Sequence, residues 1–162
     1  MKNIVLIGMM GCGKTTCSKL LAHKLGREAV DTDDVIIAQE GTSISDLFAT
    51  KGEGYFRDCE SRVARELGEK SNLIIATGGG LPLREENVSS LRSNGIIFWL
   101  KRDPVHTFQS ESLEGRPLAR EGLEAFVRRF EARAPVYAAA ADFVIEDFTS
   151  PEITVQEIMS YL

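Results

Sequence analysis

The chain has 162 residues, enough for one domain with a substantial hydrophobic core. Its 43% hydrophobic and 27% charged residues are ordinary for a globular protein, and a formal net charge of −5 argues against broad binding to nucleic acid or to an anionic membrane. An odd cysteine count without metal-ligand spacing, no signal-peptide pattern and no apolar run near the ~20 residues that cross a bilayer predict a cytoplasmic protein.

A glycine-rich segment follows the first strand pattern, which covers residues 4–7, and precedes a helical pattern. It reads Gly8-Met9-Met10-Gly11-Cys12-Gly13-Lys14-Thr15 and matches the phosphate-binding loop. Its glycines allow backbone N–H groups to surround an anion, to which the following helix adds its positive end. We expect Lys14 to reach the β- and γ-phosphates, Thr15 to ligate Mg²⁺ and Thr16 to contact the α-phosphate.

Strand and helix patterns alternate through the rest of the chain. Further strands are predicted at 28–31, 73–76, 96–100 and 143–145. Helices are predicted at 35–39, 44–50, 53–67, 85–91, from 103 onward, at 123–130 and at 155–162. The polar residues 111–122 are expected to form a loop.

This alternation predicts an α/β fold, in which a five-stranded, mainly parallel sheet is flanked by helices on both faces. We find no linker or repeat, so residues 1–162 are expected to form a single domain. Ligands of such sheets bind beyond the carboxyl ends of the strands. Three segments are expected at that edge: the loop 8–15, residues 31–33 and residues 78–80.

Two aspartates end the second predicted strand. Phosphoryl transfer to an alcohol needs a metal held in place and a group that orients or deprotonates the hydroxyl. Asp31 would hold Mg²⁺ through water, and Asp33 would accept a hydrogen bond from the attacking hydroxyl. The alternative is that Asp33 or Asp34 only caps the next helix. The third strand lacks a terminal aspartate, so metal binding would rest on Thr15 and Asp31.

The triple glycine and three arginines also admit two interpretations each. Gly78, Gly79 and Gly80 could present N–H groups to a ligand at close range, or form a flexible turn. Arg57 lies three residues before Glu60, which can steady its guanidinium, or the two form an exposed pair. Arg116 could close over a transferring phosphoryl group or be a solvated loop charge. Arg133 could bind a ligand or interact with the negative end of its helix.

The combined pattern resembles the shikimate kinases over nearly the whole chain. The shared motifs are the loop 8–16, Asp31-Thr32-Asp33, residues 44–48, Gly52-Glu53-Gly54-Tyr55-Phe56-Arg57-Asp58-Cys59-Glu60, Gly78-Gly79-Gly80, Arg116-Pro117-Leu118, and Arg133 with Tyr137. The phosphate-binding loop occurs in many NTPases. The Phe-Arg-x-x-Glu segment together with the triple glycine and Arg-Pro-Leu is more specific.

The resemblance implies phosphorylation of the 3-hydroxyl of shikimate by ATP, with Mg²⁺ as cofactor. It implies a P-loop NTPase fold like that of the nucleoside monophosphate kinases, with a substrate-binding region at about 33–61 and a lid at about 111–122. The implied catalytic residues are Lys14, Asp33 and Arg116. Nucleotide binding is implied for Gly11, Cys12, Gly13, Lys14, Thr15, Thr16 and Arg116, and metal binding for Thr15 and Asp31. Substrate binding is implied for Asp33, Arg57, Gly78, Gly79, Gly80 and Arg133, with Ile44, Phe48 and Phe56 against the apolar ring face.

The chain departs from the family pattern where an arginine often precedes the proline of the last helix, because residues 146–150 contain none. Arg102 or Phe148 could contact adenine instead. We expect shikimate and ATP as the only partners of a monomer, without nucleic acid or membrane. The alternatives are a gluconate or nucleotide kinase, a GTP-dependent switch, for which the guanine-reading motif is missing, and a nucleotide-binding module without catalysis.

Overall fold

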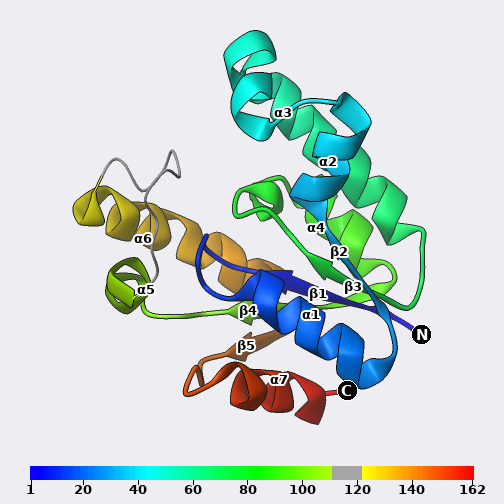
Figure 1. Ribbon diagram of the computed structural model, residues 1–162, viewed down its shortest axis with the longest axis vertical. Coiled ribbons are helices and arrows are strands. Elements are labelled where there is room, and N and C mark those ends of the chain that lie inside the picture. Colours follow the sequence, from blue (N-terminus) through cyan, green and yellow to red (C-terminus); the bar gives the residue numbers. More distant parts are fainter. Residues whose placement is uncertain (111–121) are drawn as a thin grey trace.

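A five-stranded parallel sheet organises the fold (Figure 1). The structure, a computed structural model, describes residues 1–110 and 122–162. The strands are β1 (Asn3–Ile7), β2 (Glu28–Asp31), β3 (Leu73–Ala76), β4 (Gly95–Leu100) and β5 (Phe143–Ile145), and their spatial order is β2-β3-β1-β4-β5. Each neighbouring pair is parallel, as predicted. β1 therefore lies at the centre of the sheet, and the glycine-rich loop leaves its carboxyl end.

Helices cover both faces of the sheet (Figure 1). They are α1 (Lys14–Leu25), α2 (Thr32–Glu40), α3 (Ile44–Gly68), α4 (Glu85–Arg92), α5 (Pro104–Ser110), α6 (Leu123–Ala140) and α7 (Pro151–Ser160), and a short 3₁₀ turn, η1 (Leu81–Leu83), follows the triple glycine. α1 and α7 pack together on one face. α3, α4 and α6 lie on the other face, so each face carries its own hydrophobic layer.

The central strands divide their side chains between these two layers. In β1, Val5 and Ile7 join the layer under α3 and α6, whereas Ile4 and Leu6 join the layer under α1 and α7. The same alternation continues across β4, because successive side chains of a strand point to opposite faces. Continuous apolar runs such as 4–7 and 96–100 thus indicate strands buried on both sides.

The helix boundaries differ from the prediction at α2. This helix begins at Thr32 rather than Val35, because the Asp31 carboxylate accepts hydrogen bonds from the backbone N–H groups of Asp33 and Asp34 at 2.8 and 3.4 Å. Asp31 is therefore the N-cap. The alternative that Asp33 or Asp34 caps this helix is wrong.

The two predicted helices at 44–50 and 53–67 together form α3. They remain distinct because Gly52 has φ 85° and ψ 170°. This conformation lies outside the helical range, and glycine adopts it more readily than other residues. The predicted break between them is confirmed. Ser43 caps the first part through a 3.1 Å hydrogen bond from the Asp46 N–H, also as expected for the residue before this helix.

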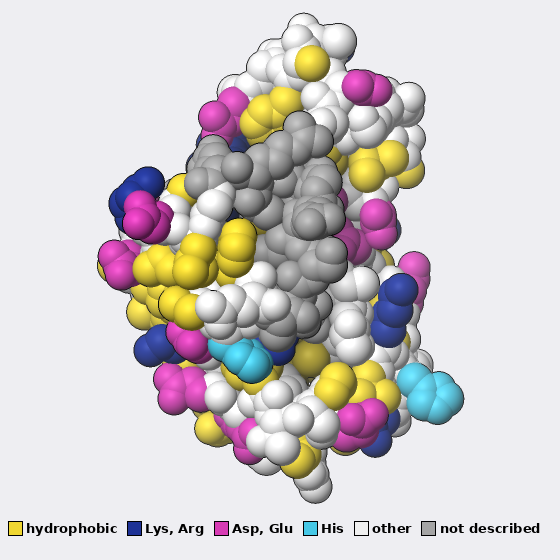
Figure 2. Space-filling model, turned by 60° about the vertical axis from the view of Figure 1, so that its left-hand side comes forward, with side chains coloured by type: hydrophobic (Ala, Val, Ile, Leu, Met, Phe, Trp, Pro, Cys, Tyr) yellow, Lys and Arg dark blue, Asp and Glu magenta, His cyan; other side chains and the backbone are white. Residues whose placement is uncertain are grey.

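Charged side chains of both signs are interspersed on the face shown in Figure 2. None of the helices in the described part of the chain has the length and apolar character needed to cross a membrane. The predicted lid at about 111–122, which includes Arg116, lies outside the described residues except for Gly122.

Candidate active site

The loop between β1 and α1 has the geometry of an anion cradle. Gly8, Gly11 and Gly13 have φ of 149°, 77° and 102°, which favour glycine. A Cβ on Gly8 would also lie 2.9 Å from the Leu100 carbonyl oxygen. The Lys14 ammonium donates to the carbonyl oxygens of Gly8 and Met9 at 2.7 and 2.8 Å. Lys14 is thus folded back over the loop, where its charge is available to a bound anion.

The start of α1 completes this cradle. Its N-cap is Gly13, which supplies no side-chain hydrogen bond, and its first turn contains no acidic residue. The N–H groups of the first turn are therefore left for a ligand, together with the positive end of the helix dipole. Thr15 and Thr16 lie in this turn and line the adjacent cavity.

Residues 31–33 lie beside the triple glycine at the same edge of the sheet. Asp31 Oδ1 serves as the cap of α2, as described above. The Thr32 hydroxyl is fully buried and accepts a 2.9 Å hydrogen bond from the Gly78 N–H, which fastens the two segments together. Asp33 Oδ1 is buried, has no hydrogen-bond partner among the described residues and lies 2.8 Å from where a Cβ on Gly78 would be. It is an acceptor in need of a donor.

The triple glycine brings the predicted substrate residues together. A Cβ on Gly79 would lie 3.1 Å from the Arg133 Nη1 atom. A Cβ on Gly80 would lie 2.8 Å from the Arg57 Cζ atom. With Asp33 against Gly78, three charged side chains from three helices meet at these residues. A Cβ at Gly78 or Gly80 would press on these side chains, and one at Gly79 would make a tight contact, so the interpretation as a close-contact surface is favoured over a merely flexible turn.

Arg57 is held by two carboxylates. Its Nη1 atom lies 2.7 Å from Glu60 Oε1 and its Nη2 atom lies 3.3 Å from Glu53 Oε1. Glu60 is 1% exposed and Arg57 19%, so the pair is not the exposed one considered as the alternative. The expectation that Glu60 steadies the Arg57 guanidinium is confirmed. A guanidinium has five N–H donors, so these two ion pairs leave Arg57 able to offer further donors to a substrate carboxylate.

Three acidic groups in this cluster have raised pKa values. Burial raises the pKa of Asp33 to about 6, and the nearby Asp31 carboxylate adds to the rise. Burial raises the pKa of Glu60 to about 7, against the opposing effect of its bond to Arg57. Burial also raises the pKa of Asp31. Carboxylates kept poorly solvated at a cleft are typical of functional sites.

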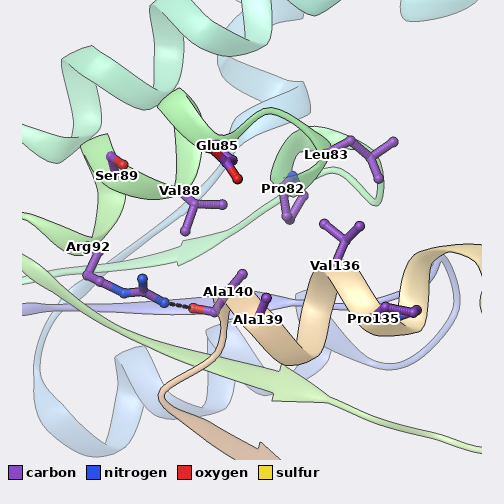
Figure 3. Close-up of a pocket in the computed structure, with 10 residues that line it drawn as sticks. All are labelled: Pro82, Leu83, Glu85, Val88, Ser89, Arg92, Pro135, Val136, Ala139 and Ala140. Atoms are coloured by element: carbon purple, nitrogen blue, oxygen red, sulfur yellow. Dashed lines mark hydrogen bonds between the residues drawn. The ribbon is translucent and has the colours of Figure 1, made fainter.

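A cavity of about 260 Å³ joins the anion cradle to the aspartates. It is lined by Met10, Gly11, Gly13, Lys14, Thr15, Thr16, Asp31, Asp33, Thr77, Gly78 and Gly79. A larger cavity of about 450 Å³ lies between α4 and α6 (Figure 3). Pro82, Val88 and Val136 are among the side chains that line it, and no predicted site residue in the described part of the chain does. Size alone would therefore select the wrong cavity.

The residues predicted to contact the shikimate ring and those predicted to contact adenine form two separate groups. Phe48 and Phe56 pack together with ring centroids 5.0 Å apart, and the Arg57 guanidinium lies 5.4 Å from the Phe56 ring centroid. Ile44 packs on the same core layer. Arg102 donates to the Gly11 carbonyl oxygen at 3.4 Å, and its guanidinium lies 6.0 Å from the Phe148 ring centroid. Both candidates for adenine contact thus lie near the phosphate-binding loop.

Two residues enter the site without having been assigned a role from sequence. Thr32 was noted only as part of the motif, and no local signal indicated that it would bind Gly78. Tyr137 is fully buried and donates a 2.6 Å hydrogen bond to the Gly79 carbonyl oxygen. Its spacing of four residues from Arg133 places both side chains on one face of α6, which was the available signal.

Comparison of the sequence with known proteins finds relatives over nearly its whole length. The family model described as shikimate kinase matches residues 10–162. A shikimate kinase of Persephonella marina is 42% identical over 98% of this chain and 98% of its own length. One from Caldicellulosiruptor saccharolyticus is 40% identical over 99% of this chain and 95% of its own length.

Solved structures agree as well. A shikimate kinase of Acinetobacter baumannii in complex with shikimate superposes with a TM-score of 0.91 and 34% identity, covering 99% of this chain and 92% of that one. A shikimate kinase of Aquifex aeolicus has a TM-score of 0.84 and 36% identity, covering 98% and 94%. By sequence, by fold and by the motifs that meet at its phosphate-binding loop, the chain belongs to the shikimate kinase family.

Proposed function

We propose that the chain transfers the γ-phosphoryl group of ATP to the 3-hydroxyl of shikimate, giving shikimate 3-phosphate and ADP. The observation that carries this proposal is the meeting of Asp33, Arg57 and Arg133 around the triple glycine, beside the anion cradle. Two guanidinium groups suit a planar carboxylate, and a carboxylate with backbone donors suits a cyclic polyol. Family membership supports the same substrate.

Each residue has a defined task in this reaction. Lys14 exchanges its bonds to the loop carbonyls for phosphate oxygens and neutralises charge that develops on the transferring group. Gly11, Cys12, Gly13, Thr15 and Thr16 enclose the phosphates. Arg57 and Arg133 bind the carboxylate and thereby fix the ring. Asp33 accepts a hydrogen bond from the attacking hydroxyl through its unpartnered Oδ1 atom, which orients that hydroxyl toward the γ-phosphate.

The site also fits a magnesium ion. Mg²⁺ prefers oxygen ligands and retains several waters, and it binds protein through one or two groups together with phosphate oxygens. Thr15 and Asp31 both line the cavity beside Lys14, so a hydroxyl and a carboxylate oxygen are available to the ion there. When bound, the ion neutralises phosphate charge. Arg116 is proposed to add a positive charge from the lid.

The free cysteines and the net charge support a proposal for the cellular setting. We propose a cytoplasmic monomer whose only partners are shikimate and ATP, acting apart from nucleic acid and membranes. Cys12, Cys17 and Cys59 are all free thiols, which suits a reducing compartment. The net charge of −5 means that anionic ligands are held by the local arginines and Lys14 rather than by the overall field.

A coupled assay of ADP release tests the substrate. Shikimate, quinate, gluconate and AMP are compared with ATP and Mg²⁺, each with Lys14→Met as the control variant. We expect shikimate to have the highest kcat/KM and Lys14→Met to abolish its turnover while thermal unfolding stays cooperative. A higher kcat/KM for gluconate or AMP would overturn the proposed substrate. Near-normal turnover by Lys14→Met would remove the loop from the mechanism.

A further inference from the structure

Tyr137 lies at the junction of the site's separate parts. It extends from α6, is fully buried and packs its ring against Trp99 with centroids 5.7 Å apart. Its hydroxyl donates to the Gly79 carbonyl oxygen at 2.6 Å. The phenol oxygen of Tyr137 also lies 3.8 Å from the Met9 sulfur, in the phosphate-binding loop. One phenol thus touches both the nucleotide side and the triple glycine.

Arg133 is the third neighbour of this hydroxyl. It lies one helical turn before Tyr137, and its Nη1 atom is 3.1 Å from where a Cβ on Gly79 would be. A hydrogen bond and the positive charge from Arg133 act on the phenol and oppose the rise of its pKa to about 12, which burial causes. The phenol therefore keeps its proton at neutral pH, so that it remains a donor.

The hydroxyl has one proton, and its direction is determined by its neighbours. Because a carbonyl oxygen cannot donate, the phenol directs its proton to the Gly79 carbonyl in the 2.6 Å hydrogen bond. Because a guanidinium cannot accept, Arg133 donates an N–H to a lone pair of the phenol oxygen. Phenylalanine would fill the same space but leave the Gly79 carbonyl and an Arg133 N–H without this partner. Buried groups left in this way reposition or bind water.

We propose that Tyr137 is a positioning residue, which holds the Gly79–Gly80 backbone and the Arg133 guanidinium in register beside the phosphate-binding loop. It acts on the substrate carboxylate through Arg133 and on the ring hydroxyls through the glycine N–H groups, without touching the reacting atoms. The inference rests on the proposed function, since it assigns Tyr137 to the binding of the acceptor rather than of ATP.

The test compares Tyr137→Phe with Tyr161→Phe, a matched control. Tyr161 is 44% exposed and stacks on Phe143, which packs on the hydrophobic layer of the opposite sheet face from Tyr137. Steady-state kinetics of Tyr137→Phe should show a rise in the shikimate KM of about tenfold, as for loss of a buried hydrogen bond. The ATP KM and kcat should stay within about threefold, because the nucleotide contacts remain. Tyr161→Phe should match the unsubstituted protein in all three constants.

A double-mutant cycle with Arg133→Ala separates positioning from a general structural role. If Tyr137 acts through Arg133, the Tyr137→Phe penalty should shrink to about twofold or less in the Arg133→Ala background. Tyr137→Met, which fills the site without a hydroxyl, should repeat the selective rise in KM and provides a second variant should the first fold poorly. Thermal unfolding checks each protein.

The possible results distinguish the proposed function from the positioning role of Tyr137. Failure of the unsubstituted protein to phosphorylate shikimate would reject the proposed function itself. If that protein is active, an unchanged shikimate KM in Tyr137→Phe and Tyr137→Met would overturn the positioning role alone. Penalties that multiply fully in the double variant, or that fall equally on ATP and shikimate, would also overturn it.

Discussion

At the scale of single residues, Asp33 combines a position and a charge state that suit an acceptor of hydrogen bonds. Its Oδ1 atom is buried without a partner among the described residues, and it lies against Gly78 at the cavity wall. A raised pKa of about 6 leaves it mostly ionised at neutral pH yet more basic than an ordinary aspartate. An ionised, unusually basic carboxylate is a strong acceptor, which suits Asp33 to orient the attacking hydroxyl.

The dependence of activity on pH follows from this charge state. At saturating Mg-ATP, kcat/KM for shikimate should fall on acidification through about pH 7 to 6, as Glu60 and then Asp33 take up protons. Each protonation lowers kcat/KM. Protonation of Asp33 removes the hydrogen-bond acceptor for the substrate hydroxyl, and protonation of Glu60 removes the negative partner of Arg57. In Glu60→Gln, the remaining acid limb should lie near pH 6, at the pKa of Asp33. A profile that is flat between about pH 5 and 8 would contradict the role of Asp33.

At the scale of elements, the triple glycine is a short segment on which three helices converge. α2, α3 and α6 deliver Asp33, Arg57 and Arg133 to it, and the Thr32 and Tyr137 hydroxyls bind its backbone on either side. Hydrogen bonds therefore fix the backbone of this segment, and the absence of side chains lets the charged groups approach it closely. Its conformation and the positions of the charged groups depend on each other.

Adding one methyl group tests this dependence. The Cβ of Gly80→Ala would press on the Arg57 guanidinium, whose Nη2 atom is 2.8 Å away, and displace it from the substrate carboxylate. We expect the shikimate KM to rise by about tenfold or more while the fold persists, because a flexible side-chain end can move aside. The control is Gly54→Ala in α3, where a Cβ meets nothing within 4 Å.

For Gly54→Ala, kinetics should be unchanged and stability should rise by about 0.5–1 kcal/mol, the usual gain for alanine in a helix. The experiment compares steady-state constants and denaturant unfolding of both variants. Equal shikimate KM values for Gly80→Ala and Gly54→Ala would show that contact between the glycine segment and Arg57 does not matter for binding.

At the scale of the whole molecule, the site lowers the stability of the fold. A carboxylate whose pKa is raised on folding binds its proton more tightly in the folded than in the unfolded chain. The free energy of unfolding therefore falls as pH rises from the unfolded value of 3.8 through the folded value of about 6. Below that range Asp33 makes no such contribution, because it is protonated in both states.

Neutralising Asp33 should consequently stabilise the ligand-free protein. Asp33→Asn is expected to raise the free energy of unfolding by about 1–3 kcal/mol at about pH 8, and by much less at about pH 4, while activity is lost. Asp34→Asn is the control, because Asp34 is exposed in the same turn of α2. Urea unfolding at the two pH values measures the difference. A loss of stability in Asp33→Asn at the higher pH would contradict this account.

Local physical rules were enough to predict much of this protein from its sequence. The phosphate-binding loop, the positions of the five strands and the helix break at Gly52 each depend on residues within one short stretch, whose spacing specifies backbone geometry. The pairing of Arg57 with Glu60 is similarly local, because it joins neighbouring turns of one helix.

Only the tertiary structure decided which distant groups meet. The placing of Arg57 and Arg133 beside the same three glycines, the bond of Thr32 to Gly78 and that of Tyr137 to Gly79 depend on how α2, α3 and α6 pack against the sheet. The role of Asp31 as a helix cap also emerged there, because the sequence had suggested only Asp33 or Asp34 for that cap. Periodicity specifies which face of an element is buried, whereas contacts between elements follow from the strand order and the packing of side chains.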